Sequence, residues 1–298
     1  MTKKRLFNAS FEGSLNLEDD TVSSKFIDKN LQEAQEKEKY RGTFKLYIWV
    51  VILTVLFIFG PNWLLYEGSY YIFHHVQNKL IQPAIYNFLP SWVFLLLGTI
   101  WLLVILIGKR FYQQFILIYR GQFHLFVTYF LWLLIEWNLF CLTGFFSTLG
   151  LLGTVSFLIV NFYLAYLIFR SRCKNLLKIM YDEEESNSKV NNFVIKIVNY
   201  FIILLGLFSV LWLCLKTFFI FKVEAGSTLG ILGLIAFWFF VNIMFAIYES
   251  YLILPFMLRG FYQLKYPEEY REWEGKSLEE WYGKKYLKKH PELLKKGL

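Results

Sequence analysis

Six long apolar stretches constrain this chain more than any other feature of its sequence. A hydrocarbon core of ~30 Å requires about 20 apolar residues in each spanning helix. Stretches of that kind cover residues 46–66, 91–108, 125–145, 149–169, 197–221 and 229–250. With 56% hydrophobic and only 18% charged residues, the 298-residue chain is also too apolar for a soluble protein. The sequence predicts an all-α, polytopic integral membrane protein with six transmembrane helices arranged as three hairpins.

The distribution of Lys and Arg predicts the orientation of these helices. Nearly all of the basic residues fall in the first 45 residues, in the loops at 109–124 and 170–196, and in the tail from 259. Because Lys and Arg are retained on the cytoplasmic side during insertion, both termini are expected inside. The external segments are then 67–90, 146–149 and 222–229. We expect a bacterial cytoplasmic membrane, or the endoplasmic reticulum if the source is eukaryotic.

The same pattern divides the chain into a polar cytoplasmic segment (1–45), a six-helix transmembrane domain (46–258) and an aromatic and charged cytoplasmic tail (259–298). The first segment lacks the apolar core of a signal peptide, so the first helix is expected to be a retained anchor. The net charge of +8 fits anionic lipid headgroups and requires no nucleic acid. The expected partners are therefore the bilayer and a cytoplasmic protein that contacts the tail or the 109–124 loop.

A repeated heptapeptide indicates duplication of one hairpin. STLGLLG at 147–153 returns as STLGILG at 227–233, an offset of 80 residues, and both copies fall at predicted external turns. Ser and Thr can cap the outgoing helix, while glycines allow two helices to approach closely. We expect outer-turn packing glycines at Gly150, Gly153, Gly230 and Gly233.

Four polar residues fall at one predicted depth of the bundle. Glu136 and Lys216 each lie 11 residues before the serine of their own outer turn, and Asn161 and Asn242 lie 14 and 15 residues beyond it on the partner helices. Ionisable groups at that depth are costly and usually face protein or a water-filled cavity. The cluster is either a binding site for a proton, ion or headgroup, or a Glu136–Lys216 ion pair that fixes the register of two hairpins.

Other candidate sites have simpler structural interpretations. His74 and His75 are adjacent and belong to no larger His or Cys cluster, so no metal site is predicted. Their segment is expected to lie along the outer interface as an amphipathic helix, and the last helix to tilt or break near Pro255. The tail is expected to form short helices, with Trp273, Trp281 and Tyr282 available to a partner or placed in an interfacial aromatic belt. The cysteines are interpreted as buried thiols: Cys141, Cys173 and Cys214.

No catalytic or cofactor motif is present. The sequence lacks a nucleophile elbow, an HExxH motif and a phosphate loop, so neither an enzyme nor a cofactor is predicted. The leading hypothesis is a transport component of the permease type with a polar site at mid-membrane. The alternative is a membrane accessory protein that acts in assembly, secretion or immunity and transports nothing. A lipid-modifying membrane enzyme is the third hypothesis.

Overall fold

The fold is helical, and several of its helices have membrane-spanning length. The computed structural model describes residues 5–20, 22–38, 48, 52–75, 83–182 and 228–296. Within these residues there is no strand. Three helical stretches in this part of the chain are long and apolar enough to cross a membrane: Ser91–Gly108, Gln114–Met180 and Gly230–Lys265. Their length and composition make this a membrane-embedded protein.

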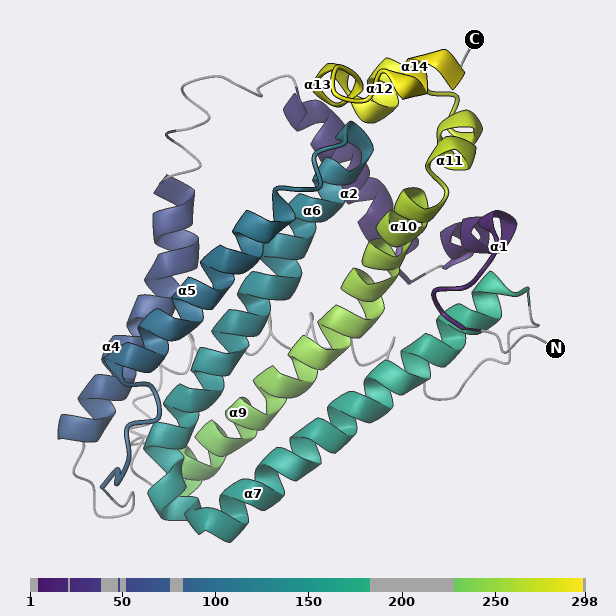
Figure 1. Ribbon diagram of the computed structural model, residues 1–298. Helices are drawn as coiled ribbons and strands as arrows, with labels where there is room; N and C mark the ends of the chain where they lie inside the picture. Colours follow the sequence, from purple (N-terminus) through teal and green to yellow (C-terminus); the bar gives the residue numbers. More distant parts are fainter. Residues whose placement is uncertain are drawn as a thin grey trace, which may run out of the picture.

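The bundle is built from long helices that lie side by side (Figure 1). The principal helices are α4 (Gly60–His75), α5 (Ser91–Gly108), α7 (Phe130–Met180) and α9 (Thr228–Tyr248). α6 (Leu117–Gln122) leads into α7, and α10 (Leu254–Lys265) extends α9. A short 3-10 turn, η3 (Gln114–Ile116), precedes α6. α7 packs against both α4 and α9, so it is the central helix of the bundle.

Helix bounds agree with the sequence for α5 and differ elsewhere. α5 covers the predicted range 91–108, because Pro90 ends the preceding extended segment. α4 instead continues to His75, into residues predicted to lie outside. The amphipathic helix expected there does not form in residues 83–90, which are irregular. α7 likewise continues to Met180 through the beginning of the predicted 170–196 loop.

Three π-helical turns interrupt the bundle helices, and two of them precede a proline. They are η2 (Val55–Phe59), η4 (Phe123–Tyr129) and η5 (Glu249–Ile253). Pro61 has no N–H for the carbonyl of Phe57, and the Tyr129 hydroxyl donates to that oxygen at 2.7 Å. Before Pro255 the turn η5 lets the helix continue into α10. The break expected near Pro255 therefore does not occur.

The first heptapeptide forms the sharp bend within α7. Gly150 has φ 66° and ψ 176°, a conformation that residues with a Cβ rarely adopt. It divides α7 into a first arm before residue 150 and a second arm after it, which diverge from the bend in Figure 1. Phe145 and Phe157, one from each arm, both pack on Trp238 of α9, with ring centroids 6.2 and 4.1 Å away. The bend is thus a turn between two helices.

Both termini fold together at one end of the bundle (Figure 1). We call this region the terminal layer; it comprises α1 (Phe11–Leu15), η1 (Asn16–Asp19), α2 (Ser24–Glu38), α11 (Pro267–Trp273), α12 (Leu278–Tyr282), α13 (Lys284–Leu287) and α14 (Glu292–Lys296). Its core joins Leu17 and Trp281 with Leu176 and Met180 of α7 and Tyr262 of α10. The short helices predicted for the tail are confirmed. The polar first segment has an ordered part that packs with them.

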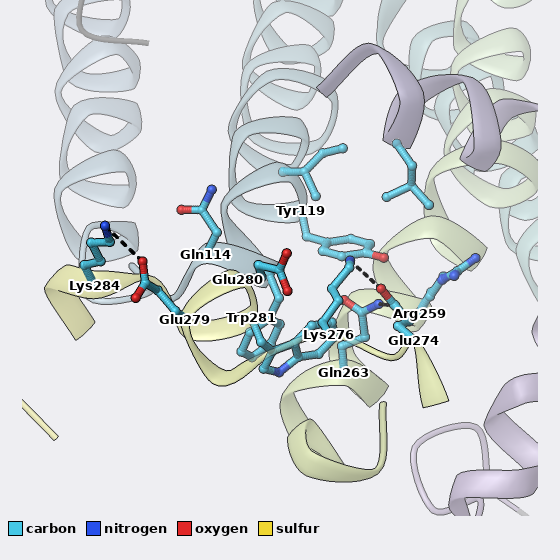
Figure 2. Close-up of a pocket in the computed structure, with 13 residues that line it drawn as sticks. Gln114, Tyr119, Arg259, Gln263, Glu274, Lys276, Glu279, Glu280, Trp281 and Lys284 are labelled. Carbon is cyan, nitrogen blue, oxygen red and sulfur yellow. Dashed lines mark hydrogen bonds and ion pairs between the residues drawn. The ribbon is translucent and has the colours of Figure 1, made fainter. Parts of the chain in front are cut away.

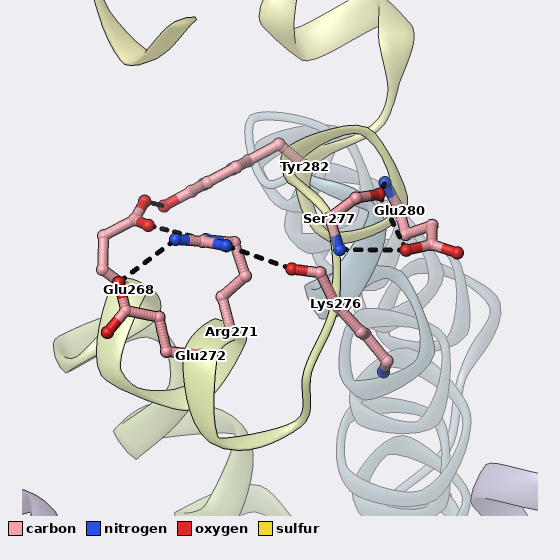
Figure 3. A network of polar contacts seen from close by, with 7 residues as sticks. All are labelled: Glu268, Arg271, Glu272, Lys276, Ser277, Glu280 and Tyr282. Carbon is pink, nitrogen blue, oxygen red and sulfur yellow. Dashed lines mark hydrogen bonds and ion pairs between the residues drawn. The ribbon is translucent and has the colours of Figure 1, made fainter. Parts of the chain in front are cut away.

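A network of polar contacts holds the tail helices together (Figure 3). The Arg271 side chain donates to Glu268 at 2.7 Å and to the carbonyl of Lys276 at 3.1 Å. Glu268 also accepts from the hydroxyl of Tyr282 at 2.7 Å, and burial together with this carboxylate raises the pKa of Tyr282. Ser277 begins α12 with a capping box. The tail therefore has a fixed fold.

That fold changes the interpretation of the tail aromatics. Trp281 and Tyr282 are buried, whereas Trp273 is 48% exposed. Trp281 stacks on Phe115, which precedes α6, with ring centroids 4.6 Å apart. The surface of three aromatic residues expected to be open to a partner is thus reduced to Trp273, because the other two bind the tail to the 109–124 segment.

Candidate functional site

Glu136 is the buried acidic residue at the centre of the bundle. It lies on the first arm of α7 and is 0% exposed. The indole N–H of Trp132, one helical turn earlier, donates to Oε1 at 2.6 Å. Its second carboxyl oxygen, Oε2, has no hydrogen-bond partner among the described residues. Within the described residues one acceptor of this carboxyl group therefore has no partner, and an unmet polar atom in an apolar interior is costly.

Asn62 on α4 is a second buried polar residue, and the sequence analysis missed it. It is also 0% exposed, and within the described part of the chain neither its amide nitrogen nor its amide oxygen has a partner. The only signal in the sequence is a single amide inside an otherwise apolar stretch. A fully buried amide without hydrogen bonds is rare in folded proteins.

Contacts between α4 and α7 place Asn62 at the level of Glu136. Near one end Phe59 packs on Trp132, with ring centroids 6.3 Å apart. Further along, the Ser69 hydroxyl donates to Thr143 at 3.0 Å. Both contacts join residues that are 73 or 74 positions apart in the chain, so the two helices run in the same direction. Asn62 and Glu136 are also 74 positions apart, and they therefore lie at the same level along the two helices. We call these two residues the polar centre.

Aromatic side chains close one side of the polar centre. Trp101, Tyr129 and Trp132 form a buried cluster, in which the rings of Trp101 and Trp132 lie 5.1 Å apart. The indole of Trp101 donates to Thr128 at 3.2 Å, and Tyr129 is held by the carbonyl of Phe57. Since the polar groups of these aromatics already have partners, the cluster shields Glu136 on one side.

A second polar cluster, unlike the first, is fully hydrogen-bonded. Asn138 on α7 and Asn242 on α9 exchange amide hydrogen bonds of 2.8 and 3.1 Å. The indole of Trp238 also donates to Asn138 at 2.8 Å. Such reciprocal bonds between helices are a means of association in membranes. Asn242, predicted as part of the mid-membrane cluster, therefore joins α9 to α7.

Of the remaining members of the predicted cluster, the structure describes Asn161 alone. Asn161 lies on the second arm of α7, where its amide donates to the carbonyl of Phe157, one turn earlier, at 2.8 Å. It forms no hydrogen bond with Glu136 or Asn242 in the described residues. Lys216 lies outside the described residues, so the predicted Glu136–Lys216 ion pair stays a prediction.

The close helix packing expected at the heptapeptide glycines stays a prediction, because residues 183–227 lie outside the described residues. A Cβ at Gly153 would meet only Leu149 of the same chain segment, at 3.4 Å, and at Gly233 no described atom lies within 4 Å. Gly230 is half-buried at the start of α9. The requirement for glycine at Gly150 is its positive φ. Among the described glycines, closer approaches occur at Gly68, against Phe140, and at Gly260, against Tyr119.

The histidines and cysteines form no cluster with each other. His74 and His75 stack on Tyr70 and Tyr71 of α4, at 4.3 and 5.0 Å. No group of three His, Cys, Asp or Glu side chains suited to a metal occurs in the described residues. Cys141 is buried and Cys173 half-buried, each as a free thiol, and Cys214 lies outside the described residues.

Comparisons with protein-family models, with curated proteins and with solved structures gave no match. The chemistry of the residues themselves is therefore the basis for assigning a function.

Proposed function

We propose that this chain is a transport component of the permease type, in which the polar centre carries a proton or small cation across the membrane. The observation that supports it is the unpartnered Oε2 of Glu136, in the described residues, beside an equally unpartnered Asn62. Intramembrane ionisable groups commonly mark ion pathways and proton relays. A carboxyl oxygen and an amide oxygen are also suitable ligands for a small hard cation.

The contrast within the bundle favours a functional over a structural role. The Asn138–Asn242 pair uses its amides for helix association and leaves each with a partner. If Glu136 and Asn62 served only to hold helices together, the same saturation would be expected. Within the described residues, Oε2 of Glu136 and the amide of Asn62 lack such partners, and they offer ligands to a species that enters the bundle.

A six-helix topology with both ends in the cytoplasm accompanies this proposal. The bend at Gly150 lets the Gln114–Met180 stretch supply two spans, and α4 supplies another. The apolar segment 197–221 lies outside the described residues and has the composition of the remaining span. In this proposal the repeated heptapeptide reflects duplication of the last two hairpins. A chain that crosses the membrane an even number of times has both ends on the same side, and both ends of this chain belong to the terminal layer. Because the sequence has no ATP-binding motif, the energy would come from an ion gradient or a partner protein.

The terminal layer favours a second candidate function, that of a membrane accessory protein. It is a folded surface at one end of the bundle, with Trp273 exposed on it. A protein partner docked there would require no transported species. In that function the polar centre would have no activity of its own.

Proton flux into liposomes tests the proposal. The purified full-length chain is reconstituted, a pH gradient is imposed, and an internal pH-sensitive dye reports the flux. We expect Glu136→Gln to abolish the flux and keep the thermal stability. The control Glu67→Gln makes the same chemical change at an exposed position of α4 and should retain the flux. Equal flux in wild type and Glu136→Gln, or wild-type liposomes no more permeable than empty ones, would contradict proton transport.

A further inference from the structure

A cleft of about 540 Å³ lies within the terminal layer (Figure 2). Its walls come from four separate parts of the chain: α2, the η3–α6 segment, the end of α10, and the tail from the end of α11 through α12 to the start of α13. The volume is in the range of small-molecule sites, which is roughly 300–1,000 Å³. The cleft is distinct from the polar centre, which lies deeper in the bundle between α4 and α7.

Three side chains of the cleft have hydrogen-bond donors without a partner in the described residues: Tyr119, Arg259 and Trp281. Tyr119 is only 4% exposed, and its hydroxyl has no partner within the described residues; the same holds for Nε of Arg259. The hydroxyl of Tyr119 lies in the field of the Arg259 guanidinium. Figure 2 shows both side chains at the same side of the cleft. Buried donors of this kind call for an acceptor, and the guanidinium favours an anionic one.

The two lysines of the cleft already have acidic partners, and Glu280 is a carboxylate held by Ser277. Lys276 pairs with Glu274, and Lys284 with Glu279 at 3.0 Å (Figure 2). Glu280 accepts from the backbone and hydroxyl of Ser277, and these bonds lower its pKa. In the described residues, none of these three acidic residues of the tail forms an ion pair with Arg259.

Arg259 does have one acidic neighbour, and that pair is weak. Its Nη2 contacts Glu18 at 2.9 Å, and the Glu18 side chain is 39% exposed. Burial raises the pKa of Glu18 even though Arg259 lowers it. Because the Glu18 side of this pair faces solvent, the pair stabilises less than a fully buried one would, so an incoming anion can replace Glu18 as the partner of Arg259.

The position of Tyr119 is fixed, which makes the donor preorganised. Its ring packs on Phe256, with centroids 4.7 Å apart, and lies so close to Gly260 that a Cβ there would approach it within 2.6 Å. The opposite wall is the stacked pair of Phe115 and Trp281. A ligand that enters the cleft therefore meets a donor already in place.

We propose that this cleft binds a phosphate group, held by the hydroxyl of Tyr119 and the guanidinium of Arg259. Arg matches the geometry of phosphate oxygens with two parallel N–H donors. The phosphate belongs either to a lipid headgroup or to a soluble phosphorylated compound. Both kinds of ligand carry the phosphate group that the cleft would bind, and an experiment can distinguish the lipid from the soluble compound.

Thermal unfolding of the full-length chain in a phosphate-free maltoside detergent tests this site. One arm adds inorganic phosphate, and the other adds phosphatidic acid in mixed micelles. A saturable rise in Tm is expected in at least one arm. If inorganic phosphate suffices, the ligand is a soluble phosphorylated compound; if only phosphatidic acid acts, the ligand is a lipid headgroup. No saturable rise in either arm, or a rise that acetate reproduces equally, would overturn the proposal.

Two variants link the effect to the cleft. Tyr119→Phe keeps the ring packing and removes the hydroxyl, and it should weaken binding about tenfold, the usual effect of losing one hydrogen bond to a charged group. Arg259→Lys keeps the charge and removes Nε, with a similar expected loss. The matched control is Tyr163→Phe, at an exposed position of α7, which should bind as the wild type does. Unchanged affinity in both cleft variants would also overturn the proposal.

Discussion

Two acidic residues near the N-terminus, Asp20 and Glu18, pair with arginines in different surroundings. Asp20 and Arg172 are 2% and 0% exposed. Asp20 also accepts from Ser23, and the guanidinium of Arg172 lies 4.9 Å from the centre of the Tyr251 ring. Breaking a buried pair leaves an uncompensated charge, whereas an exposed pair contributes little. The two pairs should therefore respond differently to neutralisation.

Asp20→Asn should destabilise the protein strongly. The variant leaves Arg172 buried without its counter-ion, a loss of about 3–5 kcal/mol by comparison with other buried pairs. Thermal or denaturant unfolding in detergent measures it. Glu18→Gln is the matched control, because it neutralises the neighbouring acid of a half-exposed pair and should change the stability by less than about 1 kcal/mol. Similar losses in both variants would contradict the assigned burial.

Glu18 should make the stability depend on pH. Because burial raises its pKa above the ordinary 4.5, the folded chain holds this proton more tightly than the unfolded chain does. Its contribution is therefore fully present below pH 4.5 and is lost as the pH rises through the folded pKa. Asp19, Asp28 and Glu274 oppose ionisation of Glu18, and Arg259 favours it. In Glu18→Gln the slope of Tm against pH in this window should flatten; an unchanged slope would mean that another group titrates.

At the scale of elements, Gly150 determines the shape of α7. Without a reversal at this residue the apolar run would continue as one straight helix far longer than a bilayer needs. The positive φ makes the bend possible, and Trp238 of α9 packs against both arms. The glycine is needed for its backbone conformation, since no described atom lies within 4 Å of a Cβ built there.

Gly150→Ala should lower the stability by about 1–3 kcal/mol, the cost for a residue with a Cβ of a backbone conformation that combines positive φ with extended ψ. Gly153→Ala is the control, because this residue is helical and its Cβ would make only a contact of 3.4 Å with Leu149. The control should be neutral or stabilising, since alanine favours helix over glycine. Urea unfolding measures the stability of the two variants. Equal losses of stability would show that the effect of Gly150→Ala does not come from the backbone conformation of Gly150.

The sequence predicted elements better than it predicted contacts. Hydropathy located α5 within its observed bounds, and the STLG turn fell at the bend, because both depend on local composition. The predicted ends of α4 and α7 were wrong, because a helix can continue beyond the bilayer where its polar residues find partners in the protein. Asn62 was missed because one amide in an apolar stretch carries no periodic signal. The partner of Asn242 is Asn138, and such a pairing requires the packing of two helices.

At the scale of the whole molecule, the described bundle holds a hydrogen-bonded amide pair, Asn138–Asn242, and a polar centre whose Glu136 and Asn62 have unpartnered atoms in the described residues. The Asn138–Asn242 pair joins α7 to α9, and the terminal layer ties both ends of the chain to α7 and α10. The rigid parts of the protein thus surround the polar centre. A proton or cation that reaches Glu136 would meet a site whose walls are already fixed, as preorganised binding requires.

Infrared difference spectroscopy of the carboxyl group of Glu136 tests this central claim most directly. The full-length protein in lipid is taken through a pH change in water and then in heavy water, with Glu136→Gln as the reference that identifies the band. If the polar centre exchanges protons with solvent, we predict a carboxyl band that changes with pH, shifts in heavy water and is missing from Glu136→Gln. A Glu136 band that neither changes with pH nor shifts in heavy water would show a sealed structural carboxyl group and would contradict the account.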